Sequence, residues 1–248
     1  MKARIKRGFY AACYILSWGW FAAVGLALNV VCTPLLLVPA RSWIGIRVRR
    51  AIRLLFKLWL CWFHACGMIR LTWTGFDEPL PAGTVYIANH PTILDATFIL
   101  AKLPDAICVM KASLMRNPAI APAAILAGYV VSGKPVDAVR DAAAKVAAGR
   151  SLLLFPEGTR TPAGTRLGPL KPAFFLCAER AKAPIQLIVV RAPADLAPKG
   201  RAWWRWPSEL PSLVTLTLDR RWEWDARRSS AELIAEIESR IVSVIGRT

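Results

Sequence analysis

Apolar residues dominate the first third of the chain. Residues 9–40 carry no charged side chain, and a helix over this run is long enough to cross a bilayer. Asn29 and Pro34 interrupt the second half of the run. Residues 43–68 form a second stretch that is rich in tryptophan and leucine. This pattern predicts either a single membrane span or a helical hairpin dipped into one leaflet.

The charges that flank these stretches favour the hairpin. Basic residues lie on both sides of the first run, and no acidic residue occurs before Asp77. Because basic flanks tend to stay on the cytoplasmic side of a membrane, both ends of the run are expected there. We therefore expect residues 1–68 to form a membrane-associated helical hairpin or anchor at the cytoplasmic face of the inner membrane.

Residues 41–57 interleave cationic side chains with large apolar ones, as helices at a membrane surface do. The absence of carboxylates in this segment favours contact with an anionic surface. The alternative is an amphipathic helix that packs on the protein's own core. The cationic residues are Arg41, Arg47, Arg49, Arg50, Arg53 and Lys57.

From residue 69 onward, short apolar strands alternate with helical patterns. Strands are expected at 71–74, 84–88, 106–111, 129–131, 151–155, 185–191 and 213–219, and helices at 92–102, 136–148, 172–182 and 229–245. Residues 114–127 are expected to be irregular or helical, because prolines interrupt them. The alternation predicts an α/β fold over residues 69–248, in which helices cover a mixed, mostly parallel sheet.

Composition indicates the kinds of partner. The net charge is +17 and eleven residues are tryptophan, which favours lipid contact and an anionic partner such as phospholipid headgroups, nucleic acid or an acidic carrier protein. Residues 193–211 combine tryptophans with cations, which suits a membrane interface, single-stranded nucleic acid or a loop pinned by packed indoles. The six cysteines include no C-x-x-C pair, so reduced thiols and no metal site are expected.

His90 lies where a candidate base is expected in an α/β protein. It follows a buried strand and precedes Pro91, which suits the start of a helix. Asp95 can reach His90 only if the histidine is in the turn and the aspartate is in the first helical turns. Such a carboxylate fixes the imidazole tautomer and leaves the other ring nitrogen as a base.

A second polar stretch, residues 155–160, follows another buried strand and should reach the same edge of the sheet. Arg160 offers a planar fork of donors that suits a phosphate. Glu157 can accept hydrogen bonds from hydroxyls, and Lys171 downstream adds positive charge.

Asn89-His90-(x4)-Asp95 followed by Phe155-Pro156-Glu157-Gly158-Thr159-Arg160 resembles the glycerolipid acyltransferase family, from about residue 71 to residue 190. The resemblance implies that His90 and Asp95 are the catalytic pair, and that Glu157, Gly158, Thr159 and Arg160 bind the glycerol-phosphate part of an acceptor. It also implies a membrane-associated element of two N-terminal helices. Lys134 stands where the family often has arginine, which leaves the acceptor headgroup open.

The expected reaction moves a fatty acyl group from acyl-CoA or acyl-carrier protein to the free hydroxyl of a lysophospholipid, namely 1-acylglycerol-3-phosphate. Arg160, with Lys134 or Lys171, would hold the headgroup, and backbone N–H groups at the histidine turn or helix start would stabilise the oxyanion. No metal, cofactor or nucleic acid is expected. The alternatives are another lipid acceptor, such as a lyso-aminolipid or polyene-type lipid, or a non-catalytic basic membrane-peripheral binding protein.

Overall fold

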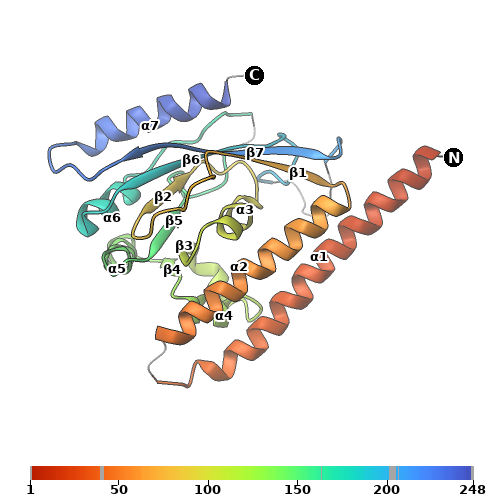
Figure 1. Cartoon of the computed structure of the whole chain (residues 1–248), viewed down its shortest axis with the longest axis horizontal. Coiled ribbons are helices and arrows are strands. Elements are labelled where there is room, and N and C mark those ends of the chain that lie inside the picture. The colour runs from red at the N-terminus through yellow and green to blue at the C-terminus, as the bar shows by residue number, and fades with distance from the viewer. Residues whose placement is uncertain (1, 40–41, 163, 201–204, 206, 247–248) are drawn as a thin grey trace.

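The computed structural model describes residues 2–39, 42–162, 164–200, 205 and 207–246. Two long N-terminal helices lie beside a sheet that further helices cover (Figure 1). The strands are β1 (Ile69–Thr74), β2 (Val85–Ala88), β3 (Ala106–Lys111), β4 (Val130–Ser132), β5 (Ser151–Leu154), β6 (Ile185–Arg191) and β7 (Ser212–Trp222). The helices are α1 (Lys2–Leu35), α2 (Ser42–Ala65), α3 (Asp95–Lys102), the short 3₁₀ helix η1 (Ala112–Arg116), α4 (Ala121–Ala127), α5 (Pro135–Ala147), α6 (Ala173–Ala181) and α7 (Ser230–Ile245).

The seven strands form one sheet in the order β1-β7-β6-β2-β5-β3-β4. Every neighbouring pair is parallel except β6 and β7. The predicted α/β fold with a mixed, mostly parallel sheet is therefore confirmed. Because β6, β2, β5, β3 and β4 run in the same direction, their carboxyl ends share one edge, where open α/β sheets place their sites.

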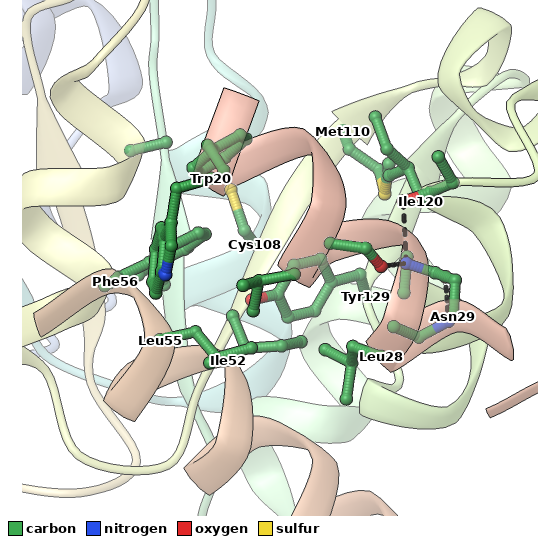
Figure 2. Close-up of a pocket in the computed structure, with 18 residues that line it drawn as sticks. Trp20, Leu28, Asn29, Ile52, Leu55, Phe56, Cys108, Met110, Ile120 and Tyr129 are labelled. Atoms are coloured by element: carbon green, nitrogen blue, oxygen red, sulfur yellow. Dashed lines mark hydrogen bonds between the residues drawn. The ribbon is translucent and has the colours of Figure 1, made fainter. Parts of the chain in front are cut away.

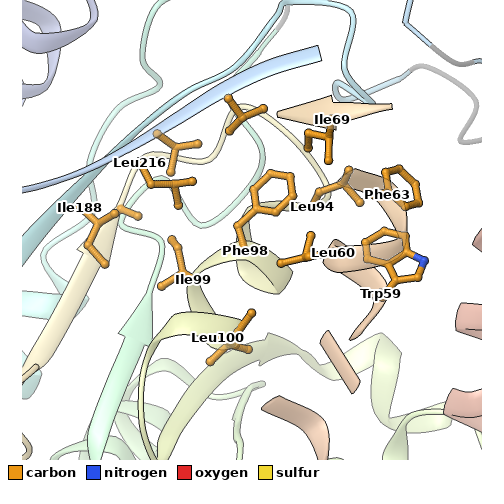
Figure 3. Close-up of a cluster of buried hydrophobic side chains, with 14 of the residues drawn as sticks. Trp59, Leu60, Phe63, Ile69, Leu94, Phe98, Ile99, Leu100, Ile188 and Leu216 are labelled. Carbon is orange, nitrogen blue, oxygen red and sulfur yellow. The ribbon is translucent and has the colours of Figure 1, made fainter. Parts of the chain in front are cut away.

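Alternate strand residues pack into separate apolar layers on the two faces of the sheet, as the pleat requires. On one face, Tyr86 and Leu216 join a cluster built with α2 and α3 (Figure 3). On the other face, Val85 and Leu187 join a cluster built with α5, α6 and α7. The helix that follows β2 is thus fixed from below by the sheet and from outside by α2.

Some element boundaries differ from the sequence expectation. The helix predicted from residue 92 begins at Asp95, because Thr92 binds the Asp95 carboxylate and holds residues 91–94 in a turn. The irregular or helical stretch expected at 114–127 is divided between η1 and α4.

Aromatic side chains hold α1 against α2. The Trp59 ring contacts those of Trp18 and Phe21, and its Nε1 donates to the Ser17 carbonyl at 2.9 Å. Residues 8–35 of α1 are long and apolar enough to cross a membrane. The placement of the two helices in a membrane, and a domain boundary at residue 68, stay predictions. The large apolar side chains that α1 exposes include Phe9, Ile15, Leu16, Leu26, Val30 and Val31.

Asn29 is a buried polar residue inside the apolar helix α1. Its Nδ2 donates to the Ala119 carbonyl at 2.7 Å and to the carbonyl of Gly25. Its Oδ1 accepts from the Ala123 backbone N–H at 2.9 Å. Instead of breaking the helix, Asn29 joins α1 to α4.

The cationic face of α2 is divided between solvent and the protein's own core. Arg49 is buried, and it donates to Asp105 Oδ1 at 2.7 Å and to the Ala127 carbonyl at 2.8 Å. Arg53 donates to the carbonyls that end α3. The remaining described cations, Arg47, Arg50 and Lys57, are exposed. The prediction that the whole segment 41–57 faces a membrane surface is therefore too broad, because Arg49 and Arg53 bind other parts of the protein.

The expectations for Arg41 and for Arg201, Trp203, Trp204 and Trp206 fall on residues that lie outside the described parts of the chain.

Candidate active site

The end of β2 is fixed by the side chain of Asn89. Its amide donates to the Val190 carbonyl and accepts from the Val190 N–H, each at 2.8 Å. Asn89 therefore continues the pairing of β2 with β6 by one residue beyond the strand. This arrangement places His90 at the carboxyl edge of the sheet, as the sequence predicts.

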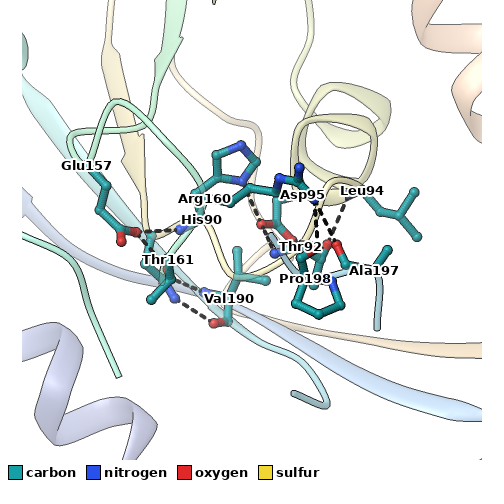
Figure 4. A network of polar contacts seen from close by, with 11 residues as sticks. His90, Thr92, Leu94, Asp95, Glu157, Arg160, Thr161, Val190, Ala197 and Pro198 are labelled. Atoms are coloured by element: carbon teal, nitrogen blue, oxygen red, sulfur yellow. Dashed lines mark hydrogen bonds and ion pairs between the residues drawn. The ribbon is translucent and has the colours of Figure 1, made fainter. Parts of the chain in front are cut away.

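His90 and Asp95 are in contact (Figure 4). His90 Nδ1 lies 2.9 Å from Asp95 Oδ2, and the aspartate side chain is fully buried whereas the imidazole remains 18% exposed. Thr92 donates to the carboxylate twice, from its N–H at 2.8 Å and from its hydroxyl at 2.7 Å. Burial raises the pKa of the Asp95 carboxyl, and the hydrogen bonds from His90 and Thr92 oppose that rise. The pair presents one ring nitrogen of His90 away from the aspartate.

Glu157 is buried beneath the histidine turn. Its Oε1 accepts from the His90 N–H at 2.8 Å and from the Thr161 hydroxyl at 3.0 Å, and its Oε2 accepts from the Gly168 N–H at 2.8 Å. The Thr161 N–H in turn donates to the His90 carbonyl at 2.8 Å. The structure thus corrects the expectation that Glu157 faces an acceptor hydroxyl, because its carboxylate already binds three protein donors.

Arg160 is half-buried and is tied to the segment after β6. Its Nη1 donates to the Pro198 carbonyl at 2.9 Å and to the Ala197 carbonyl at 3.3 Å. The Ala197 carbonyl also accepts from the Ile93 N–H at 3.2 Å. This segment therefore contacts both polar motifs, a connection that the sequence did not predict.

Lys171 and the exposed Gly158 lie together. A methyl group built on Gly158 would meet Lys171 Nζ at 3.2 Å, and the Lys171 N–H donates to the Pro156 carbonyl at 2.9 Å. Gly158 has a φ of +67°, a conformation that glycine adopts without strain. The loop thus places the Lys171 ammonium group over its own backbone at Gly158, and the next residue, Thr159, is half-buried.

Lys134 is not brought to the same place. It is exposed and caps α5 after β4, three strands from β2 in the sheet order. Three inter-strand spacings correspond to about 14 Å. Lys134 shares the sheet edge with His90, but lies well to one side of the histidine.

The backbone N–H groups of the histidine turn are already used. The N–H groups of His90, Thr92 and Ile93 donate to Glu157, Asp95 and Ala197, and that of Leu94 donates to the Thr92 hydroxyl. Pro91 has no N–H. The prediction that this turn supplies oxyanion donors is therefore wrong, while the start of α3 stays a prediction.

An apolar cavity of about 270 Å³ lies between the N-terminal helices and the sheet domain (Figure 2). Ala96, which directly follows Asp95, contributes to its wall. Sequence reasoning did not find this cavity, because its wall is assembled from residues far apart in the chain. Other lining residues are Trp20, Phe21, Leu28, Ile52, Phe56, Cys108, Met110, Ala123 and Tyr129.

Within the described parts of the chain, no group of three or more histidine, cysteine, aspartate or glutamate side chains could hold a metal ion.

Comparisons with known proteins found a matching family model, a related sequence and a similar fold. Residues 75–191 match the family model described as Acyltransferase. Over 131 residues the chain is 30% identical to the chloroplastic 1-acyl-sn-glycerol-3-phosphate acyltransferase BAT2 of Brassica napus, which covers 50% of this chain and 38% of that protein. The chain therefore spans less than half the length of this relative.

A solved structure has the same fold. The crystal structure of the 1-acyl-sn-glycerophosphate (LPA) acyltransferase PlsC from Thermotoga maritima superposes with a TM-score of 0.75 at 19% sequence identity. The match covers 99% of this chain and 96% of the other. The likeness therefore includes the two N-terminal helices as well as the sheet.

Proposed function

We propose that the chain, whose residues 75–191 match the family model described as Acyltransferase, transfers a fatty acyl group from a thioester to the free hydroxyl of a lysophospholipid. The observation that carries the proposal is the contact of His90 Nδ1 with the buried Asp95 carboxylate at 2.9 Å. A fixed, partly exposed imidazole at the edge of a sheet is suited to general base catalysis.

Asp95 accepts a hydrogen bond from the Nδ1–H of His90, so Nε2 of His90 carries a lone pair. Nε2 removes the proton of the acceptor hydroxyl while the oxygen attacks the thioester carbonyl, and Asp95 stabilises the resulting imidazolium. When the tetrahedral intermediate collapses, the C–S bond breaks and the thiolate takes the proton back from Nε2. The products are an ester and a free thiol, and His90 returns to its starting form.

Arg160 and Lys171 supply the positive charge for an anionic headgroup. The carbonyls of Ala197 and Pro198 occupy Nη1 of Arg160, and the rest of the guanidinium can face a phosphate. The ammonium group of Lys171 lies over Gly158 in the same loop. Glu157 acts from beneath by holding the His90 and Gly168 backbones, and so positions the site without touching the acceptor.

The apolar cavity is suited to the acyl chain. Its lining is almost entirely hydrocarbon, and its wall reaches Ala96, next to the proposed catalytic aspartate. An acyl chain in this cavity would be shielded from water, which is favourable for every methylene buried. Helix α1 lends Trp20, Phe21 and Leu28 to the cavity wall and exposes other large apolar side chains, so it would bring the cavity to lipid at the cytoplasmic face of the membrane.

The proposed acceptor is 1-acylglycerol-3-phosphate, after which both of the similar acyltransferases are named, and the product is phosphatidic acid. The donor is acyl-CoA or acyl-carrier protein, since both are anionic and the chain carries a net charge of +17.

The test uses the purified full chain in mixed micelles with labelled acyl-CoA and a panel of lysolipids. Wild-type protein should acylate lysophosphatidic acid, and His90→Ala should lose the activity while its thermal unfolding is retained. His64→Ala is the matched control, because His64 is exposed on α2 and is the other of the two histidines. Undiminished transfer by His90→Ala would contradict the assignment of the base.

A further inference from the structure

The imidazole of His90 has a second neighbour besides Asp95. The rings of His90 and Phe155 are stacked, with centroids 4.0 Å apart and planes inclined by 17°. Phe155 follows β5 directly and opens the second polar motif. Phe155, the first residue of the stretch 155–160, therefore covers one face of the His90 ring.

A single hydrogen bond does not fix the plane of an imidazole. The contact between Nδ1 and Asp95 holds one point on the edge of the ring, but the ring can still swing about that bond. A flat aromatic surface against the ring face removes this freedom, because rotation would separate the stacked surfaces. The edge and the face contacts together define where Nε2 points.

Phe155 is itself held in place. It is half-buried and packs on the apolar cluster formed with α2 and α3. It lies between the buried strand β5 and Pro156, whose φ is restricted by its ring. A side chain with these restraints can orient its neighbour instead of following it.

We propose that Phe155 is a positioning residue for His90, which holds the imidazole in the plane that presents Nε2 to the acceptor hydroxyl and stabilises the imidazolium formed during transfer. The second effect follows from the quadrupole of the phenyl ring, whose face attracts a cation within about 6 Å of its centre. This inference rests on the proposed acyl transfer only for the kinetic part of its test.

The kinetic experiment compares Phe155→Leu with Phe155→Tyr. Leucine keeps an apolar side chain but has no flat face, so kcat should fall by about tenfold, while KM for the acceptor stays within about twofold. Tyrosine keeps the flat face and should restore most of kcat. The control is Phe174→Leu, which removes a buried ring from α6 on the opposite face of the sheet and should lower thermal stability without this loss of kcat.

The second experiment does not depend on turnover. The chain has two histidines, so a sample with ¹⁵N-labelled imidazoles gives one set of signals for His90 and one for the exposed His64. In the wild type the relaxation of the His90 signals should report a ring as rigid as the backbone around it. In Phe155→Leu the relaxation should report a more mobile His90 ring, because the face contact is lost while the bond to Asp95 remains, and the His64 relaxation should remain unchanged.

Unchanged relaxation of the His90 signals in Phe155→Leu, or an equal change in Phe174→Leu, would overturn the positioning role. A wild-type protein that shows the expected His90 relaxation but transfers no acyl group would overturn the proposed function instead, and the positioning role would stand on the spectra.

Discussion

The backbone N–H of His90 donates to Glu157 Oε1 at 2.8 Å, across a sequence separation of 67 residues. This bond, together with that from the Thr161 N–H to the His90 carbonyl, fixes the backbone of the candidate base on both sides. The second motif is therefore part of the frame that holds the histidine, in addition to its proposed contact with substrate.

Glu157→Gln should weaken the hydrogen bonds that hold the His90 backbone, and it should affect acceptor binding less. An amide must turn its NH₂ group toward one of the three donors that the carboxylate now accepts, and a buried unsatisfied donor costs about 1–3 kcal/mol. We expect a lower unfolding temperature and a reduced kcat, with KM for the acceptor changed by less than about threefold. A large rise in KM at constant kcat would instead place Glu157 on the acceptor.

Lys171→Met and Lys134→Met form a matched pair of charge removals. Lys171 lies over Gly158 in the proposed headgroup site, whereas Lys134 lies three strands from β2. Loss of a charge-assisted contact worth about 1.4 kcal/mol raises KM for lysophosphatidic acid about tenfold, and we expect this in Lys171→Met alone. Equal effects of the two substitutions in steady-state kinetics would contradict this placement of the headgroup.

The contribution of Asp95 to the free energy of unfolding should decrease as the pH rises. Burial raises the pKa of this carboxyl above its ordinary value of 3.8. Its contribution to folding is then fully present below pH 3.8 and is lost as the pH rises through the folded-state pKa, because the folded state binds the proton more tightly.

Urea unfolding of the wild type and of Asp95→Asn across this range is the measurement for Asp95. The free energy of unfolding of the wild type, relative to the variant, should decrease as the pH rises. A relative stability that increases with pH would show that the hydrogen bonds from His90 and Thr92 outweigh the effect of burial.

Filling the apolar cavity should change the preference for acyl chain length. Ala123 is buried in its wall, on α4, and Ala123→Leu shortens the space for a chain without adding a polar group. We expect activity with long-chain donors to fall at least about tenfold relative to short-chain donors, since methylenes that lose their site each forfeit about 0.8 kcal/mol. Ile125→Phe adds volume on the exposed side of the same helix and should leave the preference unchanged.

Local patterns in the sequence were sufficient for much of the fold. The alternation of apolar strands and helices predicted the mixed sheet and the last helix, which begins at a capping box made by Ser229 with Glu232. The contact between His90 and Asp95 also follows from local geometry, since both residues lie in one turn and the helix that it starts.

Long-range contacts were beyond the reach of the same reasoning. Whether a buried glutamate faces substrate or backbone depends on which donors converge on it. Glu157 binds His90, which lies 67 residues away in sequence, as well as Thr161 and Gly168 of its own loop. Likewise, the charge of Arg49 indicated a surface, yet its partner Asp105 lies 56 residues away and lets the guanidinium be buried. Five elements, α1, α2, α3, β3 and α4, contribute side chains to the wall of the apolar cavity. No single stretch of sequence therefore predicts it.

The hydrogen bonds of Asn29 to Ala119 and Ala123 join the apolar helix α1 to the wall of the cavity. If α1 lies in one leaflet, as we propose, these hydrogen bonds fix the height of the cavity relative to the hydrocarbon. The proposed single-chain acceptor could then enter the cavity from the bilayer, and the two-chain product could leave by the same route. No hydrocarbon chain would be exposed to water during a catalytic cycle.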